Sequence, residues 1–254
     1  MKKLLSIVTL LVASVMLHGQ TIDLQWIGDA PAFSTGQSWG VPFAKGTMND
    51  NGIFKLVDAN GNVIPTQAWP LAHHNDGSVK WMGFYATFPK DADGLKLIAE
   101  KGPKKVKKVK NAPAPATIVS ADNDSEIVIN NGLYEIAFPK KGANIISRIS
   151  MDGKDIVTDG KLICQLEDRS QMKSGVLRYN DFESNVTSAT VVRSGEVAAV
   201  VKVEGKHKAV KGTREWLPFS VYFYVYKDAT PIKMVHSFVF DGEQSEDYIK
   251  GLGV

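Results

Sequence analysis

Apolar residues occur along the chain in short runs, and after residue 20 no long stretch has the i, i+3, i+4 spacing of an amphipathic helix. The runs are rich in β-branched and aromatic residues, which favour strands. We expect strands over residues 53–57, 79–88, 126–129, 133–138, 197–203, 218–226 and 232–240. Many short strands with regular turns predict an all-β barrel or sandwich.

Turn signals stand between several of these runs. Each is an Asn-Gly or Asp-Gly pair, which tolerates the positive φ angles of a tight hairpin turn. The pairs are Asn60-Gly61, Asp76-Gly77, Asn131-Gly132 and Asp152-Gly153. They predict antiparallel connections between neighbouring strands.

One run carries different side chains on its two faces, because strand side chains repeat every two residues. The two sets are Val221, Phe223 and Val225 on one face and Tyr222, Tyr224 and Tyr226 on the other. We expect the Val/Phe face to belong to the core. The Tyr face fits either packing in a sheet that is buried on both sides or the wall of a cleft.

The first 20 residues have the pattern of a signal peptide. Lys2 and Lys3 precede an apolar stretch over residues 4–17, which is short for a membrane span. We expect cleavage near Gly19 or Gln20 and a secreted or periplasmic protein. No later stretch is long and apolar enough to predict a membrane-spanning helix.

The charge of the chain is concentrated in two places. The 254 residues include 30 Lys+Arg and 27 Asp+Glu, a net charge of +3, but eight lysines fall in the acid-free segments 1–3 and 101–110. Without these lysines, 22 basic residues face 27 acidic ones and the net charge is −5. This distribution argues against a nucleic-acid partner, whose binding depends on clustered Lys and Arg.

The second basic segment also suggests how the chain is divided. Residues 104–116 are rich in Lys, Pro and Ala, a composition that predicts an extended linker, with a patch that binds an acidic polysaccharide as the alternative. We therefore expect one domain over residues 21–103 and a second over 117–254. The second domain is expected to be incomplete at its C-terminus, because the sequence stops where a further strand begins.

The cysteine and two of the histidines do not indicate a disulfide or a metal site. Cys164 is the only cysteine and lies in an apolar run, so we expect a buried thiol and no disulfide. His73 and His74 point to opposite faces if they lie in a strand, and no other cluster has ligand spacing, so we predict no transition-metal site. Motifs of serine hydrolases, nucleotide-binding loops and zinc proteases do not occur.

Two further histidines, His207 and His236, differ in their surroundings. His207 lies in a basic segment, and we expect it to be exposed. His236 lies in the middle of a predicted strand, on the face that carries Met234 and Phe238. It fits either a core histidine or part of a cleft.

Residues 40–88 contain a specific set of motifs: Gly40-Val41-Pro42-Phe43, Lys45-Gly46, the run from Asp58 to Ala72 that ends in Trp69-Pro70-Leu71-Ala72, and Asp76-Gly77-Ser78-Val79-Lys80-Trp81. The segment resembles the N-terminal RIFT-barrel domain of the exo-rhamnogalacturonan lyase-like polysaccharide lyases, a group that includes ulvan lyases. His74 and Asn75 depart from the aromatic residue and proline expected there. Residues 236–254 resemble the central β-sandwich of that family, in which a helical toroid follows.

The resemblance implies a RIFT-type β-barrel followed by an antiparallel β-sandwich, and β-elimination on a uronate-containing polysaccharide. In such a reaction a base removes the C5 proton, a neutralised carboxylate stabilises the developing charge, and an acid protonates the leaving oxygen. By residue type and placement, His236 is our candidate base or acid. Candidate neutralisers or sugar contacts are Arg214 beside Trp216, and Arg178 with Tyr179.

We predict no bound cofactor, although a divalent cation such as calcium is an alternative way to neutralise the substrate carboxylate. The expected partner is an acidic polysaccharide, and the expected state is a monomer. Two other classes of function stay open. One is a non-catalytic glycan-binding or scaffold β module, and the other is a structural or adhesion protein.

Overall fold

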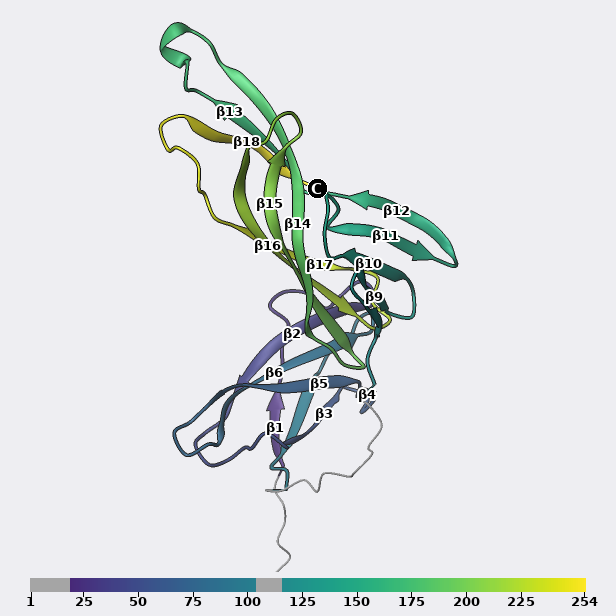
Figure 1. Cartoon of the computed structure of the whole chain (residues 1–254). Helices are drawn as coiled ribbons and strands as arrows, with labels where there is room; N and C mark the ends of the chain where they lie inside the picture. The colour runs from purple at the N-terminus through teal and green to yellow at the C-terminus, as the bar shows by residue number, and fades with distance from the viewer. Residues whose placement is uncertain (1–18, 104–115) are drawn as a thin grey trace, which may run out of the picture.

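A computed structural model describes residues 19–103 and 116–254, and these residues form strands almost throughout (Figure 1). The all-β expectation is confirmed. The predicted signal peptide up to residue 18 and residues 104–115 of the predicted linker lie outside the described residues. Within the described ranges, no helix is long and apolar enough to cross a membrane.

Residues 19–103 form two antiparallel sheets that enclose one core. One sheet has the strand order β1-β7-β3-β4 and the other β2-β6-β5. The strands are β1 (Gln20–Asp23), β2 (Thr35–Pro42), β3 (Ile53–Val57), β4 (Val63–Ile64), β5 (Thr66–His73), β6 (Val79–Phe88) and β7 (Lys96–Glu100). Phe84 on β6 is fully buried, and Trp39 stacks on it with ring centroids 5.4 Å apart.

Residues 116–254 form two further antiparallel sheets. The five-stranded sheet has the order β12-β11-β10-β9-β8 and the six-stranded sheet the order β17-β16-β15-β14-β13-β18. The first five strands are β8 (Val119–Asp122), β9 (Glu126–Asn130), β10 (Glu135–Pro139), β11 (Ile146–Met151) and β12 (Lys154–Gly160). The others are β13 (Ile163–Asp168), β14 (Arg178–Arg193), β15 (Ala198–Ala209), β16 (Glu215–Tyr226), β17 (Lys233–Phe238) and β18 (Asp247–Gly253), with a 3-10 turn at Met172–Ser174.

The predicted turns are present. Gly61, Gly77, Gly132 and Gly153 all have φ between 74° and 97°. Gly132 joins β9 to β10, and Gly153 joins β11 to β12, each pair antiparallel. Asp152 also has a positive φ of 50°, so both central residues of that turn adopt the conformation that Asp-Gly pairs favour.

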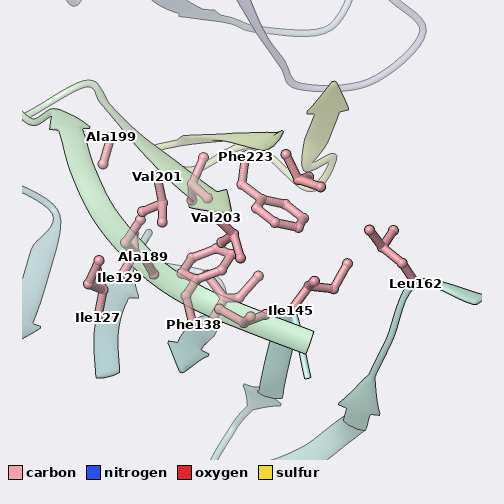
Figure 2. Packing of buried hydrophobic residues seen from close by; sticks show 14 of the residues in the cluster. Ile127, Ile129, Phe138, Ile145, Leu162, Ala189, Ala199, Val201, Val203 and Phe223 are labelled. Atoms are coloured by element: carbon pink, nitrogen blue, oxygen red, sulfur yellow. The ribbon is translucent and has the colours of Figure 1, made fainter. Parts of the chain in front are cut away.

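The core of the sandwich lies between its two sheets. Figure 2 shows Ile127, Ile129 and Phe138 of the five-stranded sheet packed toward Val201, Val203 and Phe223 of the six-stranded sheet. The rings of Phe138 and Phe223 are 4.9 Å apart. The predicted assignment of the Val/Phe face to the core is confirmed, because Val221, Phe223 and Val225 are at most 1% exposed.

The opposite face of the six-stranded sheet, which we call the outer face, meets the barrel at one end. Tyr226 is 1% exposed and packs against Tyr85 of β6, with ring centroids 5.8 Å apart. Gly36 on β2 allows this approach, because a Cβ there would lie 1.9 Å from the Tyr226 ring. Thr87 Oγ1 also donates a hydrogen bond to Lys227 O at 2.7 Å. The Tyr row is therefore covered by the barrel at Tyr226.

Candidate functional site

His236 lies on β17, on the inner face, directly opposite Val221 of β16. Its ring centroid is 6.1 Å from that of His207 and 5.7 Å from that of Phe238. Nε2 of His236 is buried and has no hydrogen-bond partner among the described residues. Burial, with a smaller effect of His207, lowers the pKa of His236, which favours a neutral ring that can accept a proton.

The expectation that His207 is exposed is wrong. Its side chain is 0% exposed, and Nδ1 donates a hydrogen bond to Leu217 O at 2.9 Å. His207 pairs with Trp216 across the ladder, and this places both residues on the inner face. Burial lowers the pKa of His207, because a charged ring would lose its hydration there.

The structure places Arg178 and Arg214 near the same carboxylate, at the end of the six-stranded sheet farthest from the barrel. Hydrogen bonds from Ser170 lower the pKa of Asp168, and the charges of Arg178 and Arg214 add to this effect. Arg214 Nη2 is 2.5 Å from Oδ2 of the buried Asp247, and Arg178 Nη2 donates to Gln171 Oε1 at 2.8 Å. Both guanidinium groups thus already have oxygen partners.

Trp216 does not suit a sugar contact. Its side chain is 1% exposed and packs against Phe182 and Phe240, with ring centroids 5.6 and 6.1 Å away. The prediction that Trp216 contacts a ligand is therefore corrected. The indole belongs to a core cluster beneath the segment that connects β17 to β18.

Tyr179 does lie at the surface, with 50% of its area exposed. Adjacent strand residues point to opposite faces, so Tyr179 lies on the outer face while Arg178 lies on the inner face. His236 is also not in contact with Arg214, because its partner Val221 is seven residues further along the chain and Trp216 and Leu217 lie between. The candidate residues therefore do not form one constellation.

A polar region covers the middle of the outer face. Its central part is a groove of about 550 Å³ whose polar lining includes Asn185, Glu204, Lys206, Glu215 and Ser237. Hydroxyl, amide and carboxylate groups of this kind are those that bind sugar hydroxyl groups. The groove is open, so an extended polymer can lie across it.

Aromatic and cationic side chains flank the groove on the side toward the barrel. Tyr222 and Tyr224 are half-buried on the outer face. Lys202 Nζ is 5.9 Å from the Tyr222 ring centroid, and Lys233 Nζ is 5.3 Å from that of Tyr224. Such cation–π pairs hold positive charge beside a flat apolar surface.

A second group of this kind lies at the opposite end of the outer face. We call it the Tyr179–Tyr248 cluster, and it consists of Glu167, Arg169, Tyr179, Tyr248 and Lys250. Glu167 pairs with Tyr179 on β14 and with Tyr248 on β18, so the three share a face. The Arg169 guanidinium lies 3.9 Å above the Tyr248 ring.

Sequence reasoning found only Tyr179 of this cluster. The i, i+2 spacing of Glu167 with Arg169, and of Tyr248 with Lys250, was a usable signal that each pair shares a face. Nothing local in the sequence indicates that β13 pairs with β18, because residues 169–246 separate them.

Other features of the described residues add no chemistry. Cys164 is buried, and burial raises its pKa to about 11, so the thiol is not a nucleophile at neutral pH. Among the described residues, no group of three or more His, Cys, Asp or Glu is arranged to hold a metal ion. The barrel has an apolar cavity of about 550 Å³ lined by Trp26, Phe33, Trp39 and Phe88, among others.

Comparison with known proteins gives two family matches and one relative. The PcRGLX-like N-terminal RIFT barrel domain matches residues 20–100, and the PcRGLX-like protein central β-sandwich domain matches residues 118–254. The uncharacterized protein YetA of Bacillus subtilis (strain 168) is 28% identical over 233 residues. That match covers 91% of this chain and 26% of the relative, so the chain spans about a quarter of the relative's length.

Proposed function

Since the chain belongs to the PcRGLX-like family, the rhamnogalacturonan lyase-like group that its motifs resemble, we propose that it acts, after export, in the β-elimination of a uronate-containing polysaccharide such as rhamnogalacturonan or ulvan. The family membership is the observation that carries this proposal. In addition, the groove and the aromatic side chains of the outer face of the six-stranded sheet are suited to hold the polymer.

Recognition of the polymer is the part of this function that the described residues support best. The outer face has aromatic surfaces at both ends and a groove with hydroxyl, amide and carboxylate groups between them. Aromatic side chains pack against the apolar faces of sugar rings, and the polar groups exchange hydrogen bonds with their hydroxyls. The net charge of −5 outside the two lysine segments means that attraction to a polyanion depends on a few placed cations.

In the catalytic form of the proposal, His236 moves the proton, and the sugar residue that is cleaved must reach the inner face of β17, where His236 lies opposite Val221. Its Nε2 has no partner among the described residues, and its lowered pKa keeps the ring neutral and able to act as a base. Neutralisation of the substrate carboxylate then falls to Arg178 or Arg214, or to a cation such as calcium.

A specific observation favours the second candidate function, a glycan-binding module without its own catalysis. The buried Trp216 and Leu217 lie between His236 and Arg214, and Arg214 is already bound to the buried Asp247. A base and a neutralising group must both reach the same sugar residue. Binding without cleavage is the outcome that this arrangement predicts for the described residues alone.

One experiment separates these functions. The purified chain is incubated with rhamnogalacturonan or ulvan, the unsaturated uronate product is followed by its absorbance, and binding is measured by affinity electrophoresis in the same polymers. Carboxyl-reduced polymer is the matched control. Product supports the lyase function, and retardation without product supports the binding module. Neither product nor retardation in any acidic polymer would overturn the proposal.

If product forms, His236→Gln tests the assigned base. The variant should lose at least about a hundredfold in rate, because removal of a general base has effects of that size. Its melting temperature should stay close to that of the wild type, since the His236 ring nitrogen has no partner to lose. A fully active, folded variant would remove His236 from the mechanism.

A further inference from the structure

The Tyr179–Tyr248 cluster has the geometry of a prepared binding site for a sugar-borne anion. We propose that it binds one uronate residue of an acidic glycan, with the carboxylate at Arg169 and Lys250 and the sugar ring against Tyr179. This inference rests on the proposed function, because it names a subsite for the same class of polymer.

The positions of the two phenols follow from strand register. β13 lies between β14 and β18, and Glu167 is directly opposite both Tyr179 and Tyr248. Neighbouring strands are about 4.8 Å apart, so the strands of the two tyrosines are separated by about 10 Å. The Arg169 guanidinium covers the Tyr248 ring. The ring of Tyr179 is half exposed and remains the accessible flat surface.

A buried carboxylate holds the cations in place. The Glu167 side chain is 7% exposed, and its Oε1 accepts a hydrogen bond from Arg169 Nε at 2.7 Å and lies 2.5 Å from Arg169 Nη2. Lys250 Nζ lies 3.6 Å from Oε2 of the same group. Arg169 is the largest cause of the lowered pKa of Glu167, so this carboxyl group stays charged.

The balance of charge leaves the cluster positive. One carboxylate, that of Glu167, faces two cations, Arg169 and Lys250, which gives a local charge of +1 on a body that is otherwise acidic. The side chains of Arg169 and Lys250 are 35% and 55% exposed, so both are accessible to a ligand. Guanidinium has five N–H donors, and Glu167 accepts a hydrogen bond from one of them.

The neighbouring residues define where an anion is accepted. Asp181 lies two residues from Tyr179 on the same face, and its Oδ1 accepts a hydrogen bond from Gln165. Further along, Lys161 neutralises Glu183 at 2.9 Å. Asp181 therefore repels an anion from the centre of the face, and the carboxylate is directed toward Arg169 and Lys250 at the end of the sheet.

The test measures binding of rhamnogalacturonan oligosaccharides by calorimetry, with the wild-type chain and single variants. Lys250→Gln and Arg169→Gln should each raise the Kd about tenfold, the effect of one charge-assisted contact. Tyr179→Ala should raise it about fivefold and Tyr179→Phe should leave it unchanged, because the ring rather than the hydroxyl makes the contact. With carboxyl-reduced oligosaccharides, the effect of Lys250→Gln should disappear.

Lys140→Gln is the matched control, since Lys140 also pairs with a carboxylate, that of Asp122 at 2.7 Å, but at the five-stranded sheet and away from the outer face. It should bind as the wild type does. If the wild type binds no acidic glycan, the proposed function itself fails. If the wild type binds and the folded Lys250→Gln, Arg169→Gln and Tyr179→Ala variants bind equally well, only the subsite is overturned. Equal binding of a sulfated oligosaccharide that lacks carboxylates would overturn the assignment to uronate.

Discussion

His207 and His236 form a pair of neutral rings on the inner face of the sandwich, 6.1 Å apart. Nε2 of each is buried without a partner among the described residues. Protonation of either ring would place an unpaired charge in an apolar surrounding next to Phe219. The pair therefore links the stability of the fold to pH.

We predict that the protein becomes less stable as the pH falls from about 7.5 to about 5.5. The unfolded chain takes up protons at the ordinary histidine pKa of 6.5, whereas burial lowers the pKa of both rings in the folded state. The unfolded state thus binds more protons below that pH, and the melting temperature should fall. Above about pH 7.5 both states are neutral at these rings, and the dependence should vanish.

The matched control is the double variant with His207→Gln and His236→Gln. The glutamine at position 207 can still donate a hydrogen bond to Leu217 O, but neither glutamine can gain a proton in this pH range. Its melting temperature should change less than that of the wild type between the two pH values. An equal fall in both proteins would assign the pH dependence to other groups.

His207 also shows how far the burial of a single residue can be predicted from the sequence. Its lysine-rich neighbours favoured exposure, but the alternation that begins at Val201 and Val203 places residue 207 on the buried face. This two-residue alternation indicated the burial of His207 more reliably than the charge of its neighbours did. In contrast, nothing local indicates that Trp216 would be covered by residues 239–246, because that cover comes from a connection between two sheet edges.

At the scale of elements, the connection from β17 to β18 closes one end of the sandwich core, and it is the yellow segment in Figure 1. The two strands are consecutive in the chain but lie at opposite edges of the six-stranded sheet. Asp241 holds this connection, because its Oδ1 accepts the Leu217 N–H at 2.7 Å. Leu217 has φ +46° and is fully buried, so its backbone depends on that partner.

We predict that Asp241→Ala lowers the free energy of unfolding by about 1–3 kcal/mol, because it leaves the buried Leu217 N–H without a partner. Tryptophan emission should shift to longer wavelength as water reaches Trp216. Urea unfolding followed by fluorescence measures both effects. Gln244→Ala, an exposed change in the same connection, should have neither effect, and equal results for the two variants would contradict the role of Asp241.

The strands themselves were predictable to different degrees. Apolar runs such as Val79–Phe88 matched their strands closely. The longest strand, β14 (Arg178–Arg193), was not predicted from the sequence. Its outer face is polar along most of its length, so the segment contains no apolar run that would indicate a strand. That same polarity forms part of the candidate binding face, so the strand that matters most for the proposed function was the hardest to detect.

At the scale of the whole molecule, the barrel is attached to the sandwich through a small hydrophobic cluster with aromatic residues at its centre and a few hydrogen bonds beside it. Tyr85 and Tyr226 belong to it, and Gly36 of the barrel packs so closely on Tyr226 that no Cβ would fit there. The family match predicts that both domains occur together, but their contact arises from side chains far apart in sequence. Only the structure reveals why residue 36 has no side chain.

We predict that Gly36→Ala weakens the contact between the domains by about 1–3 kcal/mol, since the added Cβ would lie 1.9 Å from the Tyr226 ring. Calorimetry should then show broader unfolding or two separate transitions. Gly40→Ala on the same strand is the control, because its nearest neighbour would be 3.6 Å away. A single sharp transition in both variants would show that the contact does not couple the domains.

The edge positions of β17 and β18 also set an order of events during folding. β13 can pair with β14 early. Its other edge has no hydrogen-bonded neighbour until residues 169–246 have been synthesised and β18 pairs with it. Contacts over such sequence distances form late, because closing the intervening loop reduces the entropy of the chain before any contact compensates. We expect the burial of Trp216 beneath that connection to be the last step of folding. Its fluorescence would then report the pairing of β18 with β13.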